Sequence, residues 1–376
     1  MRRWVWMMGL ILAAGAVRAA DDQAFFAILA ETTSNRMVGM PAMPALPPGV
    51  TLPPQIAAQM AAMSGAPQRK LNIRLWTPSI APDDATAYVT PPAGLKQGPR
   101  LDLDLYRPKP EEGTTTPGTP GTPGQPPMTD FTIKLYWGSS TTVRPGQPKV
   151  IRLSDMMPTD RQRAAAESAK ARAAAGGSSY FYKAGWTTGY WPSQKQPGTI
   201  GPDASLQGTF GLNSTYSGNV TLDVGPDVDF LDAFNLSSPD LSQKPDLTQS
   251  IALRWARIQH MLGCYAMGMG MESGNTEILW SSSEVESFPF YEDYMQMADV
   301  RKLVDDTKFM PGDHTACDIP AGIFANCDKM FMMKMSGWGN GTARDGTQPL
   351  PRLQTKTSLS IIIPPKGMGG MGGRGR

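Results

Sequence analysis

The side chains best suited to binding chemistry are six aromatic residues within residues 180–192, YFYKAGWTTGYWP. Aromatic faces stack on sugar rings, and the polar tips of Tyr and Trp donate hydrogen bonds at protein interfaces. Packing at a junction between two β regions is the commoner use of such a run, and an exposed surface for a polysaccharide or protein partner is the alternative. The candidate binding residues are Tyr180, Tyr182, Trp186, Tyr190 and Trp191.

Methionine is abundant, with 24 residues that cluster at 37–43, 267–271, 330–335 and 368–371. Thioethers ligate Cu(I), and Met267, Met269 and Met271 alternate so that they share one face of a strand. Tyr265 has the same parity. We therefore expect this face to form a hydrophobic core with Met330 and Met332 opposite, because methionine fills irregular gaps. Copper binding stays an alternative, and no metal or cofactor is predicted.

Hydrolytic chemistry has little support in the sequence. There are two histidines, His260 and His314, and no G-x-S-x-G, H-E-x-x-H or phosphate-binding motif. Asp313 and His314 shortly precede Cys317, which could therefore act as a thiol nucleophile. A disulfide would compete for that thiol. A carbohydrate-active hydrolase remains the enzymatic alternative, since paired carboxylates cleave glycosides. The clustered carboxylates, which we expect on solvated faces, are Asp102 with Asp104, and Glu284, Glu286, Glu292 and Asp293.

Residues 1–19 read as a secretory signal peptide. Arg2 and Arg3 precede an apolar core at 4–16, which is too short to span a bilayer, and Val17-Arg18-Ala19 fits cleavage after Ala19. We therefore expect a protein exported to the periplasm or beyond, with no transmembrane anchor in the mature chain.

An oxidising compartment permits a disulfide between two of the three cysteines. We expect Cys317–Cys327 to close a short loop and Cys264 to be a buried thiol, the alternative being that none is bonded. Without the three leader arginines, the 35 basic residues fall to 32 against 33 acidic ones. This near-neutral balance excludes a dedicated nucleic-acid partner, which requires a basic face.

The fold class expected is mostly β, with antiparallel β-sandwich domains, a few short helices and disordered Pro/Gly-rich segments. Strict alternation predicts strands at 71–76, 101–106, 131–136 and 149–154. The organisation predicted is a helix over 21–38 plus a Pro/Met-rich linker (20–69), a β region (70–155) whose loop 107–130 joins adjacent strands, an Ala-rich helix (156–177), an aromatic-rich β segment (178–236), a sandwich (248–345) and a disordered tail (364–376).

The segment 248–345 carries a resemblance to a known fold. The order L-x-W in IALRWARI, G-x-Y in GCYAMGMGM and a strand ending W-S-S resembles the core of fibronectin type III-like sandwiches. The resemblance implies that Trp255 and Tyr265 pack between two antiparallel sheets. Residues 288–308 read as an inserted helix. YWG, GYWP, SSSEV and IPAGIF are also similar to strings in exported bacterial proteins of unknown function, which implies no activity.

Taken together, the sequence predicts an exported, non-catalytic binding or structural module of the cell envelope. It would recognise a polymer or protein partner through its aromatic-rich surface. The alternatives are a carbohydrate-active hydrolase and methionine-based periplasmic copper binding.

Overall fold

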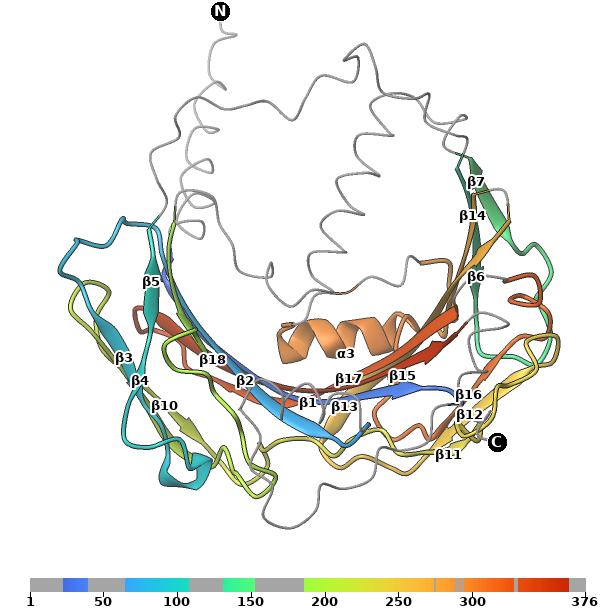
Figure 1. The fold of residues 1–376 in the computed structure, drawn as a ribbon. Coiled ribbons are helices and arrows are strands. Elements are labelled where there is room, and N and C mark those ends of the chain that lie inside the picture. The colour runs from blue at the N-terminus through green and yellow to red at the C-terminus, as the bar shows by residue number, and fades with distance from the viewer. Residues whose placement is uncertain are drawn as a thin grey trace, which may run out of the picture.

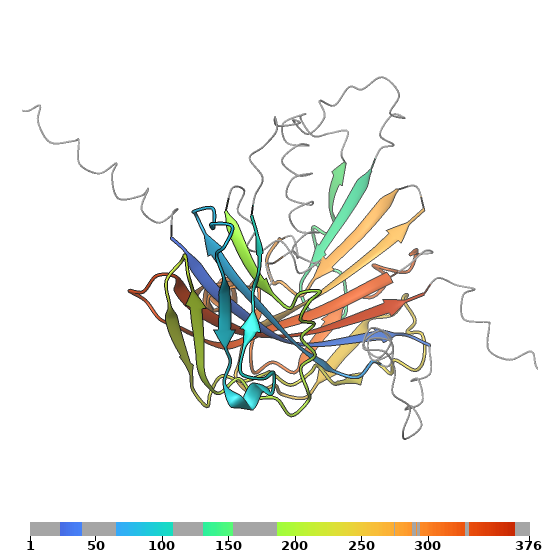
Figure 2. The ribbon, with the colours of Figure 1, turned by 60° about the vertical axis from the view of Figure 1, so that its left-hand side comes forward.

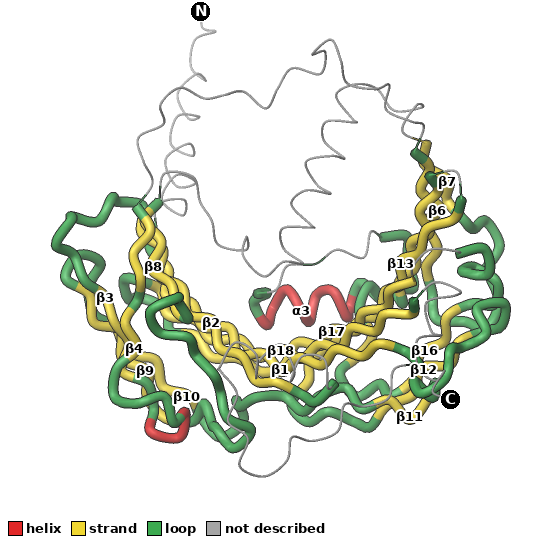
Figure 3. The backbone as a smooth tube through the Cα atoms, viewed as in Figure 1, coloured by secondary structure: helices red, strands yellow, loops and turns green. Residues whose placement is uncertain are grey.

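A strongly curved sheet dominates the computed structural model, which describes residues 23–39, 65–107, 131–152, 186–273, 275–287, 291, 294–327 and 331–364. The sheet forms a trough, with one helix on its concave side and two small sheets on its convex side (Figure 1; Figure 3). The mostly-β fold class is therefore confirmed. The predicted signal peptide, the proline-rich segment 40–55 and the Ala-rich helix lie outside the described residues, as do nearly all of the 107–130 loop and of the 364–376 tail.

The large sheet contains 11 strands. All its pairings are antiparallel except β1 with β18 and β14 with β6. Across the trough the order is β5 (Asp104–Tyr106), β8 (Thr187–Trp191), β2 (Gln68–Thr77), β1 (Phe25–Met37), β18 (Leu350–Ile363), β17 (Phe331–Ala343), β13 (Met261–Glu272), β14 (Thr276–Ser281), β6 (Thr132–Trp137) and β7 (Lys149–Arg152), while β15 (Met310–Pro311) also pairs with β13.

Each half of the convex side is covered by a small sheet (Figure 2). One has the order β10 (Val220–Val224), β9 (Gly208–Ser214), β3 (Ala87–Thr90) and β4 (Leu101–Asp102), with the 3-10 turn η2 (Ala93–Leu95) beside it. The other has the order β11 (Leu236–Ser238), β12 (Ile251–Trp255) and β16 (Ala316–Ile319). The first encloses a core with β1, β2 and β8, called the first core below, and the other encloses the second core with β13, β14 and β17.

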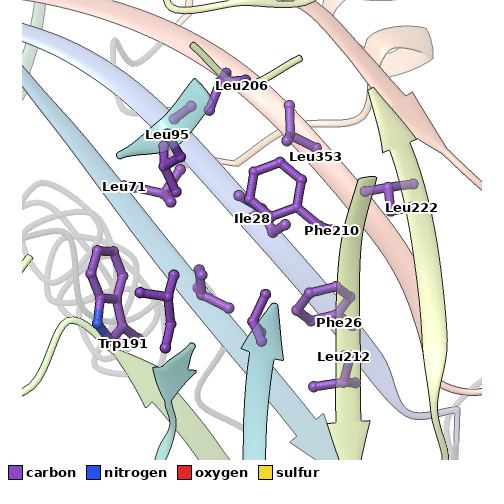
Figure 4. Close-up of a cluster of buried hydrophobic side chains, with 14 of the residues drawn as sticks. Phe26, Ile28, Leu71, Leu95, Trp191, Leu206, Phe210, Leu212, Leu222 and Leu353 are labelled. Atoms are coloured by element: carbon purple, nitrogen blue, oxygen red, sulfur yellow. The ribbon is translucent and has the colours of Figure 1, made fainter. Parts of the chain in front are cut away.

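The central strand β18 contributes to both cores. Phe26 and Ile28 of β1 and Leu353 of β18 lie in the first core (Figure 4), whereas Leu359 and Ile361 of β18 lie in the second. Within each strand, these side chains are an even number of residues apart, so they point to the same face of that strand. A single long strand thus ties the two cores together.

The concave side carries α3 (Met297–Asp305), which confirms a helix within the predicted 288–308 segment. Its Val300 packs with Tyr265 of β13, Trp338 of β17 and Phe309. The Tyr265 ring stacks on Phe309 and Trp338, with centroids 5.3 and 5.8 Å away. No helix in the described ranges is long and apolar enough to cross a bilayer.

Two predicted elements are wrong. Residues 25–37 form strand β1 rather than a helix, because a central strand packed on both faces reads as a continuous apolar run such as FFAILA. The alternating segment LDLDLY divides between β4 in a small sheet and β5 in the large sheet. In addition, β5 and β6 lie at opposite ends of the large sheet, so the segment between them does not join adjacent strands.

Candidate functional site

An aromatic and charged surface lies at the β5 end of the trough. On β2, Leu71, Ile73 and Leu75 enter the first core, so Arg74 and Trp76 point to the concave side. Strand pairing aligns Asp104, Tyr190 and Arg74 in one row across β5, β8 and β2. The neighbouring row contains Tyr106, Thr188 and Trp76. The name rim surface is used below for Arg74, Asp104, Tyr106, Thr188 and Tyr190.

Arg74 is held in place by several contacts. Its guanidinium lies over the Tyr190 ring, 5.9 Å from the centroid, and donates to the carbonyls of Ile73 and Trp191 at 2.9 and 3.1 Å. Burial lowers the pKa of Arg74, which Tyr190 partly opposes, but an arginine stays charged at neutral pH. The site thus presents a fixed cation beside an aromatic face.

The outer part of the rim surface is accessible and polar. Tyr106 is 50 % exposed, and Asp104 forms an ion pair with Lys195 at 3.2 Å. Directly opposite Tyr106, the Thr188 Oγ1 of β8 is buried and has no hydrogen-bond partner among the described residues.

The predicted aromatic residues occupy different places. Tyr180 and Tyr182 lie outside the described residues. Tyr190 belongs to the rim surface, and Trp186 is half-buried against the cluster of Ala27, Trp76 and Tyr294. The prediction that Trp191 lies on a binding surface is wrong, because its side chain is fully buried in the first core (Figure 4).

Sequence reasoning missed four of the five rim residues. Asp104 was expected on a solvated face, and Arg74, Tyr106 and Thr188 were not singled out. Their common location depends on the pairing of β5 with β8 and of β8 with β2, segments far apart in the chain. The only local signal was the alternation of TTGYW, in which Thr187, Gly189 and Trp191 are buried while Thr188 and Tyr190 are half-buried.

The floor of the trough is polar. Glu31 of β1 pairs with Lys356 of β18 at 3.6 Å, and Ser358 donates to the Glu31 carboxylate at 2.8 Å. The Lys356 ammonium also lies 5.3 Å from the centroid of the Trp338 ring. One row further along, the buried polar atoms Gln68 Nε2, Thr33 Oγ1 and Ser336 Oγ have no hydrogen-bond partner among the described residues.

Tyr265 and Met267 of the methionine face of β13 lie in a hydrophobic cluster, as expected, but this cluster is covered by α3 and is not the core between two sheets that a sandwich requires. Cys264 and Ala266 enter the second core, whereas the Met face lies on the concave side with Tyr265. The reason is steric: a Cβ on Gly268 would lie 2.8 Å from the Phe324 ring, so only the small residues of β13 fit against that core. Met332 lies directly opposite Met269 on the concave side, and Met330 is outside the described residues.

The predicted Cys317–Cys327 disulfide is wrong. All three cysteines lie in the described ranges, and none is joined in a disulfide. Cys317 is buried in the second core, while the Cys327 sulfur packs onto Gly270 of β13. Burial raises the pKa of Cys317 to about 12 and moves that of Cys264 upward as well, with further contributions from neighbours. A thiol with such a raised pKa is a poor nucleophile at neutral pH.

The clustered carboxylates are neutralised by basic neighbours. Glu284 pairs with Arg144 and Glu286 with Lys149, while Glu292 and Asp293 lie outside the described residues. Asp102 pairs with Arg100 at 2.6 Å and belongs to a different sheet from Asp104. Within the described part of the chain, no group of His, Cys, Asp and Glu side chains is arranged to hold a metal.

The two residues singled out by the fibronectin-like resemblance lie apart. Trp255 of β12 is buried between the sheets in the second core, with the Phe234 ring 6.0 Å away. Tyr265 lies instead on the concave side, beneath α3. No protein-family model, curated protein or solved structure matches the chain.

Proposed function

We propose that this protein is an exported, non-catalytic binding module of the cell envelope, and that its rim surface holds a polysaccharide. The row of Asp104, Tyr190 and Arg74, continued by the exposed ring of Tyr106, carries this proposal. Export rests on the leader-like residues 1–19.

The chemistry of a sugar matches the residues of the rim surface. The apolar face of a pyranose ring stacks on aromatic side chains, and its hydroxyls require both donors and acceptors. Tyr106 and Tyr190 offer rings, Arg74 offers donors, and Asp104 offers acceptor oxygens.

Preorganisation supports binding at this place. Arg74 is fixed by two backbone carbonyls, and all of the rim side chains stand on paired strands. Side chains that are already ordered lose little entropy when a ligand binds. Asp104 and Glu284 each form an ion pair with a basic neighbour, which supports a role in binding for these carboxylates over a role in hydrolysis.

The test compares retention of the full-length protein on insoluble polysaccharides, such as cellulose, chitin and peptidoglycan, with that of Tyr106→Ala and Tyr190→Ala. We expect at least one polymer to retain the wild type and each variant to bind at least about fivefold more weakly, which corresponds to about 1 kcal/mol per lost ring contact.

Tyr88→Ala is the matched control. Tyr88 on β3 is also half-buried and stacks under an arginine, with the Arg100 guanidinium 3.9 Å from its ring centroid, but it belongs to the other sheet. This variant should bind as the wild type does. Equal losses for Tyr88→Ala and Tyr190→Ala, or no retention of the wild type on any polymer, would contradict the proposal.

A further inference from the structure

Three methionines gather on the concave side of the trough, away from the rim surface. Met269 of β13 lies directly opposite Met332 of β17, and Met271 follows two residues later on the same face of β13. All three are half-buried. We propose that Met269, Met271 and Met332 form a thioether site for Cu(I), a role that goes beyond the proposed polysaccharide binding and does not depend on it.

The strand register places the three side chains close enough for their sulfur atoms to reach one ion. Residues directly opposite in an antiparallel pair have Cβ atoms about 4.5–5.5 Å apart, and diagonal neighbours about 7–8 Å apart remain within reach of long side chains. Met269 and Met332 are the direct pair, and Met271 is the diagonal neighbour of Met332. Methionine has three rotatable bonds, so its sulfur can turn toward a shared centre.

Packing does not account for these residues. Met333 and Met335 of β17 fill the second core, and Met267 is buried under α3 with Tyr265. Met269, Met271 and Met332 belong to neither cluster. The face of β13 that meets the small sheet is made of Cys264, Ala266, Gly268 and Gly270 instead.

The surroundings suit a soft monovalent ion. In the row that contains the direct pair, the flanking positions are Ile362 of β18 and Leu279 of β14, both apolar. Soft thioether ligands select Cu(I) over hard cations. The nearest charged positions on this face are Lys334 of β17 and Glu277 of β14, which have opposite signs, so the added charge of one Cu(I) meets a balanced neighbourhood.

The experiment is an anaerobic Cu(I) competition with bicinchoninate, using full-length protein. Because the chain has 24 methionines, the readout is the difference between variants rather than total binding. We expect Met269→Leu/Met332→Leu to lose one equivalent of Cu(I) relative to wild type. The matched control, Met333→Leu/Met335→Leu, changes the same residue type on the opposite face and should retain that equivalent.

A second measurement keeps the proposal testable if a variant is unstable. Silver(I), a redox-inert substitute for Cu(I), should protect Met269, Met271 and Met332 of the wild type from peroxide oxidation in peptide mass spectra. The internal reference is Met37, which is 45 % exposed and should oxidise equally with and without silver. Equal Cu(I) binding by wild type and Met269→Leu/Met332→Leu, or no protection of the three methionines, would overturn the proposal.

Discussion

Glu31 of β1 and Lys356 of β18 form an ion pair across the parallel pairing at the centre of the trough. Lys356 is only 2 % exposed, so its charge is withdrawn from water. Removing one partner of a buried pair leaves an uncompensated charge. The pair therefore couples two strands that are far apart in the sequence.

Glu31→Gln should lower the free energy of unfolding by about 3 kcal/mol, since it leaves Lys356 buried without its counter-ion. Urea denaturation at pH 7 measures this loss. Asp306→Asn, which removes the surface ion pairs of Asp306 with Lys302 and Lys308 at the end of α3, is the control and should cost under about 0.5 kcal/mol. Similar losses of unfolding free energy for the two variants would contradict the conclusion that the Glu31–Lys356 pair is buried.

Stability should also fall in acid because of Glu31. Burial raises the pKa of this carboxyl, but Lys356, the hydrogen bond from Ser358, and then Lys334 and Lys70 outweigh it, so the pKa lies below the ordinary 4.5. A carboxyl whose pKa is lower in the folded state than in the unfolded state stabilises the fold at pH values above the unfolded pKa. That contribution is lost as the pH falls through the folded pKa. The urea midpoint should decline below about pH 5, and less steeply in Glu31→Gln.

Gly268→Ala tests the close packing of β13 on the second core. The new Cβ would lie 2.8 Å from Phe324 and 3.1 Å from Phe331. The centroids of these two rings are already only 4.3 Å apart. Overpacking of this kind costs about 1–3 kcal/mol. Gly211→Ala in β9 is the strand-matched control, because its nearest neighbour is the Thr90 Cβ at 3.8 Å, and it should leave the melting temperature nearly unchanged. An unchanged melting temperature for Gly268→Ala would argue against this packing.

Alkylation of native protein with iodoacetamide at pH 8 should modify Cys327 first. Cys327 is half-buried, whereas Cys264 and Cys317 are buried and their raised pKa values keep them as thiols. Peptide mass spectrometry gives the order of modification. Recovery of Cys317 and Cys327 as a linked pair of peptides, resistant to alkylation until reduced, would reinstate the disulfide that the structure excludes.

The fragment 248–345 should not fold alone, although its sequence resembles a sandwich domain. It lacks β1, β6 and β18, and Leu359 and Ile361 of β18 fill the second core. We expect the isolated fragment to show poor dispersion in proton NMR spectra, while the full-length protein shows a dispersed spectrum. A folded fragment would mean that the second core is complete without β18.

Local patterns predicted the strands that have one polar face. The strand at 71–76 was predicted correctly because Asn72 and Arg74 alternate with Leu71, Ile73 and Leu75, which the structure buries in the first core. The segment FFAILA was misread because it is apolar at every position, as suits a central strand. Long-range pairing, such as that of β1 with β18, leaves no mark on neighbouring residues and could not be predicted.

The candidate site illustrates the same limit. The parity of Tyr190 and Trp191 shows that they face opposite ways, but not which of them meets a core. The Met face of β13 was likewise recognised as one face. Its placement in a core between two sheets failed because Gly268 and Gly270, rather than the methionines, make room for Phe324 and Cys327.

The pairing of β1 with β18 has a consequence for how the chain acquires its structure. The hydrogen bond from Ser358 to Glu31 joins residues 327 positions apart, so β1 has no partner on that side until the last strand has been synthesised. Contacts of such long sequence separation form slowly, because a large loop must close first. An incomplete chain therefore keeps an unpaired strand edge, and folding is completed only after β18 has been synthesised.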